Sequence, residues 1–263
     1  MPIHPPPRLR RLDDAVFKQT AYEVMQEVFK LHNTIGCLFD EAIYKRALAA
    51  RIEGARVEVP INLTFRDYRK TLYLDLLVAD GAIFEFKAAE RIHERHRAQL
   101  MNYLYLLELP HGKLINLRPE TVDHEFVNAT IPRSQRISFR VKDEAFMQRP
   151  GLAYCFCDLF TEILRDWGTC LDVLLYEEAL LHIFGGSQTV ARPVEIRIAG
   201  TPVGNQKLNL LCDNTSFHIT SIRTGLDRYE EQLKRFLKHA SVEAIQWANV
   251  GRKLVIYKTI TKA

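Results

Sequence analysis

Residues 73–87 read YLDLLVADGAIFEFK, and this stretch decides the fold. Two strongly apolar runs flank the turn-forming tripeptide Ala79-Asp80-Gly81. This pattern predicts two antiparallel strands joined by a tight turn. Charged residues interrupt the apolar runs at three positions, Asp75, Glu85 and Lys87. The predicted hairpin therefore carries polar chemistry within strands that are otherwise suited to a protein core.

The spacing of the three charged residues places them together. Side chains alternate along a strand, so Glu85 and Lys87 point to one face while Phe84 and Phe86 point to the other. The hairpin brings Asp75 close to Glu85. Because buried charges are costly unless they are paired or bound to metal, two carboxylates beside one ammonium suit a hard divalent cation such as Mg²⁺. The alternative is a salt bridge between Glu85 and Lys87 on an edge strand that faces water.

The pattern of apolar residues predicts the elements around the hairpin. In chain order we expect helices at 14–31 and 39–52, strands at 57–65, 70–79 and 82–88, a helix at 92–107 and a strand at 113–117. Two helices, three strands, a helix and a strand form an α/β core with a mixed sheet. Residues 1–13 contain three consecutive prolines and several arginines, which predicts a flexible basic arm.

A set of residues in a fixed order carries a family resemblance: Gly36, Glu41-x-x-Tyr44, Asp75, Glu85-x-Lys87 and Gln99-x-x-x-Tyr103. This order resembles the PD-(D/E)XK nuclease superfamily and, more closely, its bacterial GxxExxY proteins. The runs Gln99-Leu-Met-Asn-Tyr-Leu104 and Leu114-Ile-Asn116 also fit, and the resemblance covers about residues 16–127. One departure is visible, because alignment on Glu41 places Leu38 where the family's naming glycine stands. That change affects the entry to a helix rather than the chemistry.

The resemblance implies a restriction-endonuclease-like fold and a role for each matching residue. Asp75 and Glu85, with the backbone carbonyl of Phe86, would bind Mg²⁺, with Mn²⁺ as a second candidate. Glu41 would complete or support the metal shell. Lys87 would orient the attacking water or stabilise the charged transition state, while the metal would lower the pKa of bound water.

The helix after the hairpin supplies the remaining candidates in this half. Gln99 would position the site or the nucleic-acid backbone, and Tyr103, one turn later on the same face, would pack beneath it. Arg95 and His96 lie just before Gln99 and are candidates for contacts with phosphate groups. A solvated start of the helix is the alternative explanation for these basic residues.

The second half of the chain repeats the order of elements after an expected linker at 128–150, in which 137–141 could alternatively pair as a strand. Residues 151–263 are expected to form helices, three strands, a helix and a final strand. Matching residues recur at nearly constant offsets: Tyr44 and Tyr176 at 132, Gln99 and Gln232 at 133, Leu74 and Leu208 at 134. We therefore expect a tandem duplication, with one PD-(D/E)XK domain at 14–127 and a second at 151–263.

The expected second copy lacks the residues of the site. Val173, Asn209, Ile219 and Ser221 are the expected counterparts of Glu41, Asp75, Glu85 and Lys87, so no carboxylate or ammonium remains. This half is interpreted as a degenerate, pseudonuclease domain. It either covers an exposed face of the first copy or adds a surface that holds the substrate. Three basic residues on one predicted helix favour the second role, namely Lys234, Arg235 and Lys238.

Composition restricts the class of protein. The chain has 263 residues, 47% hydrophobic and 26% charged, with a net charge of +4. Up to Ile131 there are 18 basic and 18 acidic residues, so the positive excess lies in the second half. No apolar run approaches the roughly 18–20 residues of a membrane span. Five cysteines and the absence of a secretory signal predict reduced thiols in the cytoplasm.

The sequence as a whole predicts a Mg²⁺-dependent nuclease that acts on DNA, with its active site in the first copy only. The alternative is a non-catalytic nucleic-acid-binding or assembly module of the same fold. Two copies of one fold in one chain are expected to pair about a pseudo-two-fold axis, as the subunits of a homodimer do.

Overall fold

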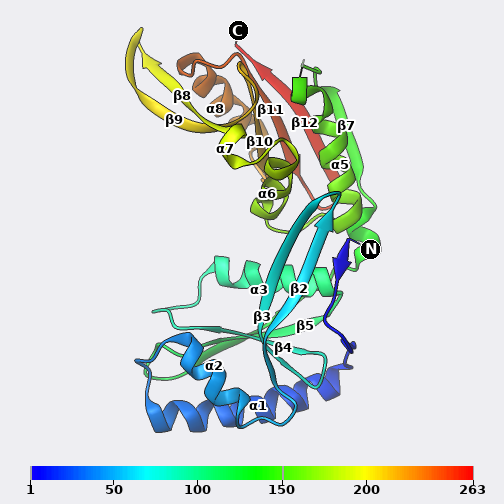
Figure 1. The fold of residues 1–263 in the computed structure, drawn as a ribbon, viewed down its shortest axis with the longest axis vertical. Coiled ribbons are helices and arrows are strands. Elements are labelled where there is room, and N and C mark those ends of the chain that lie inside the picture. The colour runs from blue at the N-terminus through cyan, green and yellow to red at the C-terminus, as the bar shows by residue number, and fades with distance from the viewer. Residues whose placement is uncertain (1, 150, 263) are drawn as a thin grey trace. The chain divides into compact units, whose positions relative to one another are not determined.

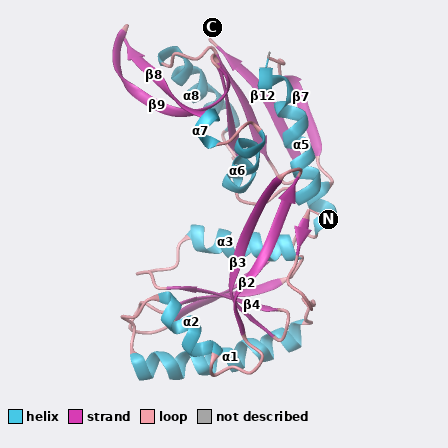
Figure 2. Cartoon of the chain, viewed as in Figure 1, coloured by secondary structure: helices cyan, strands magenta, loops and turns pink. Residues whose placement is uncertain are grey.

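The computed structural model describes residues 2–149 and 151–262, and the chain forms two compact units. Unit 1 holds the residues up to Thr64 together with Arg69–Arg133, and unit 2 holds Phe65–Tyr68 together with the residues from Ser134 onward. Each unit is built around one six-stranded sheet with helices against it (Figures 1 and 2). No helix within the described residues has the length and apolar character needed to cross a membrane.

Unit 1 is a mixed sheet between two layers of helices. Its elements are β1 (Ile3–His4), α1 (Asp14–Ile35), α2 (Glu41–Ala49), β2 (Arg56–Phe65), β3 (Tyr68–Val78), β4 (Ala82–Lys87), α3 (Glu94–Leu107), β5 (His111–Asn116) and β6 (Asp123–Asn128). The strands lie in the order β1-β2-β3-β4-β5-β6. The predicted hairpin is confirmed as β3 and β4, which pair antiparallel, while β4 and β5 pair parallel across the connection through α3.

The two faces of this sheet are covered by different helices (Figure 1). Phe84 and Phe86 of β4 lie in one apolar cluster with residues of α1 and α2, including the fully buried Val28 and Leu48. The opposite face meets α3, and it does so closely at Gly112, where an added Cβ would lie 2.9 Å from the Leu100 side chain. The face that carries Glu85 is therefore the face beneath α3.

The first residues of the chain are ordered against unit 1, which corrects the prediction of a flexible arm. Ile3 pairs with Leu63 in β2, and the backbone N–H of Arg10 donates to Asp80 O at 2.8 Å. Ile3 and Leu12 are 9% and 8% exposed. Burial of these two apolar side chains and strand pairing at the sheet edge outweigh the effect of the prolines between them.

Unit 2 repeats the same architecture with a second mixed sheet. Its elements are α4 (Arg133–Ile137), β7 (Arg140–Ala145), a 3₁₀ turn (Gly151–Cys155), α5 (Phe156–Trp167), α6 (Val173–Ile183), α7 (Ser187–Val190), β8 (Ala191–Ile198), β9 (Thr201–Cys212), β10 (Thr215–Thr220), α8 (Leu226–His239), β11 (Ala244–Val250) and β12 (Leu254–Thr261). The order is β7-β12-β11-β10-β9-β8. Phe156 and Phe160 of α5 contact Tyr257 on one face, while Leu237 of α8 packs with Trp247 on the other.

The segment expected as a linker, 128–150, contains two elements of secondary structure. β7 pairs parallel with β12, with Arg140 opposite Leu254. Arg136 in α4 is 1% exposed, and its guanidinium donates to the carbonyl oxygens of Trp167 and Thr169. The polar composition of the segment concealed this role, because Arg136 is buried to satisfy backbone carbonyls at the end of α5 rather than to face water.

The two sheets share a strand order and a parallel pair of strands at matching positions. The strands β2 to β6 and β8 to β12 follow one another in the same spatial order, and β10 and β11 pair parallel as β4 and β5 do. The phenol of Tyr44 donates to Gly36 O at 2.6 Å, and that of Tyr176 donates to Gly168 O at 2.5 Å. Corresponding bonds thus close the loop between the two helices that open each unit.

Candidate active site

Two carboxylates from neighbouring strands lie at the centre of the candidate site in unit 1. The β3–β4 ladder pairs Leu76 with Phe84, which sets Asp75 of β3 against Glu85 of β4. Asp75 is 7% exposed, and its Oδ2 accepts a hydrogen bond of 2.8 Å from the backbone N–H of Phe86. This bond holds the Asp75 carboxylate against the strand that carries Glu85.

Glu85 is the most deeply buried acid of the site. Its side chain is fully buried, Oε1 accepts a hydrogen bond of 2.6 Å from Lys87 Nζ, and Oε2 has no hydrogen-bond partner among the described residues. Burial is the main cause that raises the pKa of Glu85 to about 8, and the negative charge of Asp75 adds to it. The ammonium of Lys87 acts in the opposite direction and lowers this pKa. A buried oxygen without a partner is rare in folded proteins, and a bound ion or a water can satisfy it.

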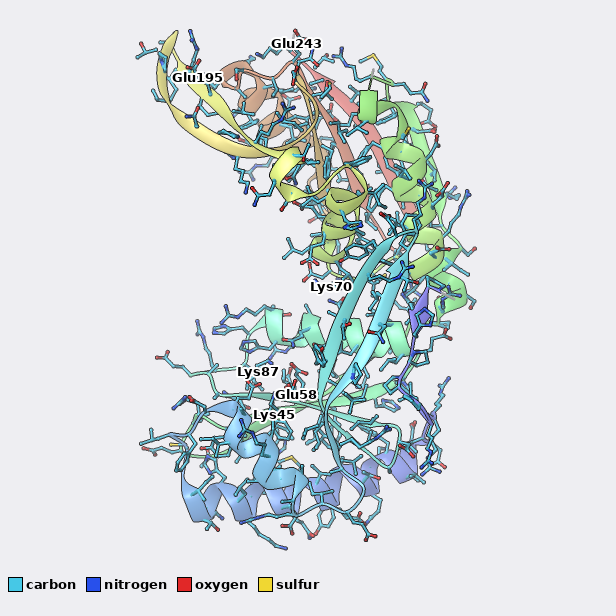
Figure 3. The ribbon with its side chains drawn as sticks, in the orientation of Figure 1. Lys45, Glu58, Lys70, Lys87, Glu195 and Glu243 are labelled. Carbon is cyan, nitrogen blue, oxygen red and sulfur yellow. The ribbon has the colours of Figure 1, made fainter. Side chains whose placement is uncertain are left out.

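A second ammonium, on α2, pairs with Asp75 and with two further carboxylates. Lys45 Nζ lies 2.8 Å from Asp75 Oδ1 and 3.5 Å from Glu41 Oε1, and it also forms an ion pair with Glu58 (Figure 3). The Lys45 side chain is only 10% exposed. Burial, followed by the charge of Asp75, raises the pKa of Glu41.

Sequence reasoning missed Lys45 and Glu58, although part of the signal was present. Lys45 lies four residues after Glu41, and that spacing places both on one face of a helix. Glu58 gave no such signal, because it belongs to β2 and adopts a left-handed backbone conformation with φ of 50°. Strand alternation alone therefore does not predict where its carboxylate points.

The helix α3 places its two candidate residues in contact over the sheet. Gln99 Nε2 donates to the phenol oxygen of Tyr103 at 3.0 Å, and Tyr103 is 6% exposed. Burial, together with the negative charge of Glu85, raises the pKa of Tyr103. Beyond the end of β4, the side-chain amide of Asn116 bonds to both the N–H and the carbonyl of Ala89, which fixes the chain after Lys87.

Residues 18–128 match the PD-(D/E)XK nuclease superfamily. The matched span contains every residue of the candidate site described above, from Glu41 to Tyr103. No curated protein is similar enough to the chain to be matched with it. Among solved structures, one titled "Crystal structure of SSO0001" is 17% identical, covering 46% of this chain and 63% of that one, with a TM-score of 0.29. The chain thus aligns with less than two thirds of that protein.

PD-(D/E)XK nucleases generally use divalent metals, and the residues of unit 1 fit such an ion. Asp75, Glu85 and the backbone carbonyl of Phe86 offer oxygen ligands, and Glu85 Oε2 is buried with no hydrogen-bond partner in the described part of the chain. Mg²⁺ needs only one or two protein carboxylates, because it keeps several waters. Within the described residues no group of three or more His, Cys, Asp or Glu side chains converges as a metal centre. Glu41 instead faces Lys45 at 3.5 Å.

The candidate residues for nucleic-acid contact differ in accessibility. His96 is 6% exposed, and its Nδ1 accepts a hydrogen bond from the backbone N–H of His93, so its side chain caps the start of α3. Arg95, in contrast, is exposed. On α8, Lys234 forms ion pairs with two glutamates, Glu230 at 3.1 Å and Glu231 at 2.9 Å. The two other basic candidates of α8 are exposed: Arg235 and Lys238.

Unit 2 carries other side chains at the ladder positions of the candidate site. Glu85 pairs with Leu114 in unit 1, and the same position of the parallel ladder in unit 2 holds His218, paired with Trp247. Lys87 pairs with Asn116, and the matching residue Thr220 pairs with Asn249. This corrects the expected counterparts, Ile219 and Ser221, by one residue.

The correction has a structural cause in the preceding turn. Three residues, 79–81, join β3 to β4, whereas only two, 213–214, join β9 to β10, and the β9–β10 register shifts between Thr215 and Ser216. An offset taken from β9 is therefore one residue too large for β10. The counterparts expected from the sequence, Ile219 and Ser221, carry no carboxylate or ammonium, and neither do the ladder counterparts, His218 and Thr220. Under both alignments unit 2 therefore lacks the equivalents of Glu85 and Lys87.

Proposed function

We propose that this protein is a divalent-metal-dependent nuclease that hydrolyses phosphodiester bonds in DNA and that its one active site lies in unit 1. The convergence of Asp75, Glu85 and Lys87 at the end of the β3–β4 hairpin, inside the span that matches the nuclease superfamily, carries the proposal. The same three side chains form the motif that gives the superfamily its name.

The proposed roles follow from the contacts of each side chain. Asp75, Glu85 and the Phe86 carbonyl would hold Mg²⁺ or Mn²⁺. When bound, this metal would polarise the phosphodiester and lower the pKa of a bound water. Lys87, now 2.6 Å from Glu85, would place its ammonium beside the phosphate oxygen where negative charge develops. Glu41 would support the metal shell from α2.

Lys45 and Gln99 would act as positioning residues. Lys45 holds the carboxylates of Asp75, Glu41 and Glu58 close together in spite of their mutual repulsion. Gln99, fixed by its hydrogen bond to Tyr103, presents an amide over the same face of the sheet and would contact the nucleic-acid backbone together with Arg95. His96 would join them only if the start of α3 rearranged.

Unit 2 is proposed to be a pseudonuclease domain that arose by tandem duplication and contributes to substrate binding. The shared strand order, the matching parallel strand pairs and the equivalent Tyr44 and Tyr176 bonds support common descent. Arg235 and Lys238 would contact phosphates, and Lys234 would contribute less because two glutamates already neutralise it. All five cysteines are free thiols, which agrees with the proposed cytoplasmic location.

The test is incubation of the protein with supercoiled, linear and single-stranded DNA in Mg²⁺, Mn²⁺ or EDTA, with RNA of equal length beside it. The proposal expects DNA cleavage in either metal and none in EDTA. Binding of DNA without cleavage in any metal would contradict it and would favour a non-catalytic module of the same fold. Cleavage of RNA alone would correct the substrate.

A further inference from the structure

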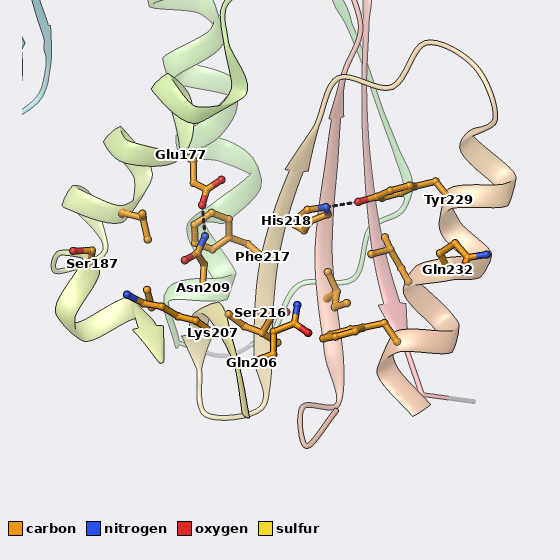
Figure 4. A pocket seen from close by; sticks show the side chains of 16 residues that line it. Glu177, Ser187, Gln206, Lys207, Asn209, Ser216, Phe217, His218, Tyr229 and Gln232 are labelled. Atoms are coloured by element: carbon orange, nitrogen blue, oxygen red, sulfur yellow. Dashed lines mark hydrogen bonds between the residues drawn. The ribbon is translucent and has the colours of Figure 1, made fainter. Parts of the chain in front are cut away.

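Unit 2 contains a cavity on the face of its sheet beneath α8, the face that carries the active-site candidates in unit 1. Its volume is about 650 Å³, within the roughly 300–1,000 Å³ of small-molecule sites. Figure 4 shows side chains of α6 and β9 on one side of it and of α8 on the other. Apolar side chains including Leu208, Leu233 and Phe236 form much of its lining.

One wall of the cavity is a flat aromatic pair without charge. His218 Nε2 lies 2.6 Å from the phenol oxygen of Tyr229, and the two ring planes are within 14° of parallel (Figure 4). Burial lowers the pKa of His218 and raises the pKa of Tyr229, so both rings are neutral near pH 7. Trp247 supports Tyr229 with its ring centroid at 5.6 Å. Such a surface favours stacking of a planar ring.

The opposite side, formed by α6 and β9, offers a carboxylate. Asn209 Nδ2 donates to Glu177 Oε1 at 2.5 Å, which leaves Glu177 Oε2 without a hydrogen-bond partner in the described part of the chain (Figure 4). Gln232, at the mouth of the cavity, adds an amide. A carboxylate repels phosphate and accepts hydrogen bonds only, so it selects a ligand edge that carries donors. The one cationic group of the lining is the exposed Lys207.

We propose that this cavity binds a guanine base, stacked against His218 and Tyr229 and held by Glu177. Guanine is the nucleobase that presents two adjacent donors, N1–H and the N2 amino group, and these match the two oxygens of a carboxylate. Adenine and cytosine place a ring acceptor beside their amino group, which the carboxylate would repel, and thymine and uracil offer one donor between two acceptors. Lys207 would meet the phosphate of the same nucleotide at the rim.

The base could come from a free nucleotide or from an unpaired guanine in a strand, and titration calorimetry with the full chain in EDTA separates the two. The probes are the four nucleoside 5′-monophosphates and two single-stranded thymidine 10-mers, one of which carries a single central guanine. GMP is expected to bind at least about tenfold more tightly than the others, because its two donors bond to a charged carboxylate. Tighter binding of the guanine 10-mer than of GMP would identify the strand as the source, and the reverse would identify the free nucleotide.

Variants locate the ligand within the cavity. Tyr229→Ala and Gln232→Ala should weaken GMP binding, and Glu177→Gln, which keeps an acceptor for Asn209, should remove the preference for guanine. Gln188→Ala is the matched control, because Gln188 is exposed on α7 and does not line the cavity. Unchanged GMP affinity in Tyr229→Ala and Glu177→Gln, or equal affinity for all four nucleotides, would overturn the inference.

The inference does not rest on the proposed nuclease activity. Asp75→Asn, which changes unit 1 alone, should bind GMP as the unchanged chain does, whether or not the protein cleaves DNA. Loss of GMP binding in Asp75→Asn would place the ligand in unit 1 and contradict the assignment to unit 2. Failure of cleavage with intact GMP binding would leave the inference standing and contradict only the nuclease.

Discussion

Glu85 in unit 1 and His218 in unit 2 occupy the same position in two sheets of the same order, yet they form sites of different character. Glu85 lies among carboxylates and ammonium groups, whereas His218 lies in an aromatic pair beside a cavity. In both units the helix after the ladder covers this position, α3 in one and α8 in the other. The comparison teaches that the sheet determines where a site can form and that few side chains decide its chemistry.

The largest expected effect comes from making unit 1 resemble unit 2 at one position. Asp75→Asn copies the residue type of Asn209 and keeps an oxygen that can accept from the Phe86 N–H. It removes one negative charge from the metal ligands, so metal-dependent cleavage should fall about a hundredfold or more. A plasmid cleavage assay measures the rate, and circular dichroism checks the fold.

The matched control for this change is Asp213→Asn in unit 2, where the side chain is 96% exposed. This variant should cleave as the unchanged chain does. If both variants kept the full rate, Asp75 would not be a metal ligand and the two units would not differ in the way proposed.

The second prediction is that rising pH destabilises unit 1 through Glu85, whereas falling pH destabilises unit 2 through His218. The folded pKa of Glu85, about 8, lies above its ordinary value, so its contribution to the free energy of unfolding is greatest below pH 4.5 and is lost as pH rises through 8. The folded pKa of His218 lies below its ordinary value of 6.5, so its contribution is present above pH 6.5 and is lost as pH falls below it.

Thermal melts in EDTA between pH 5 and 9 measure both effects. Glu85→Gln should reduce the loss of stability on the alkaline side, and His218→Gln should reduce the loss on the acid side. A variant whose melting temperature follows the same pH curve as the unchanged chain would show that its group is not held in the neutral form by burial.

A smaller effect is expected from the basic residues of α8. The affinity for DNA falls as salt rises, with a negative slope of log affinity against log salt. Arg235→Ala and Lys238→Ala should each reduce the magnitude of this slope by about 0.9, the change for one lost phosphate contact. Lys234→Ala should change the slope less, because Glu230 and Glu231 already pair with Lys234. Fluorescence anisotropy in EDTA at several salt concentrations measures the slopes, and slopes equal to that of the unchanged chain in all three variants would contradict a role for this helix.

The smallest difference is expected at the two matched tyrosines. Tyr44→Phe and Tyr176→Phe each remove a fully buried phenol that donates to a glycine carbonyl, and Tyr176→Phe also removes the acceptor of the Leu171 N–H at 3.2 Å. The lost bond to glycine should cost about 1 kcal/mol of the free energy of unfolding in each unit, and Tyr176→Phe should cost more because a second bond is lost. Denaturant titration measures both, and a large effect in one unit alone would show that the bond is not equivalent in the two units.

The sequence predicted the centre of unit 1 because local rules govern it. The turn at 79–81 and strand alternation determine where Asp75, Glu85 and Lys87 point. In the structure Asp75 accepts a hydrogen bond from the backbone N–H of Phe86, the residue after Glu85, and Lys87 donates to Glu85 directly. Lys45 and Glu58 could not be found in this way, since their ion pair depends on how α2 packs against β2. The ordered start of the chain was also missed, and a strand at 137–141 was only an alternative to a linker where β7 (Arg140–Ala145) forms, because both depend on pairing with distant strands.

The cavity of unit 2 was beyond sequence reasoning for a related cause. The alignment by residue offsets crossed a turn one residue shorter than its counterpart and so placed Ile219, not His218, at the position of Glu85. A single residue of register moves a side chain to the opposite face of a sheet. This error of one residue concealed the aromatic pair that His218 forms with Tyr229.

The most direct test of one active site per chain, in unit 1, is a time course on supercoiled plasmid with Mg²⁺, run for the unchanged chain, Lys87→Ala and the exposed control Lys30→Ala. One active site cuts one strand at each binding event, so nicked circles should accumulate before linear DNA for the unchanged chain and for Lys30→Ala. Lys87→Ala should leave the plasmid supercoiled. Linear DNA without a nicked intermediate at concentrations where the chain is monomeric, or full activity of Lys87→Ala, would contradict the account.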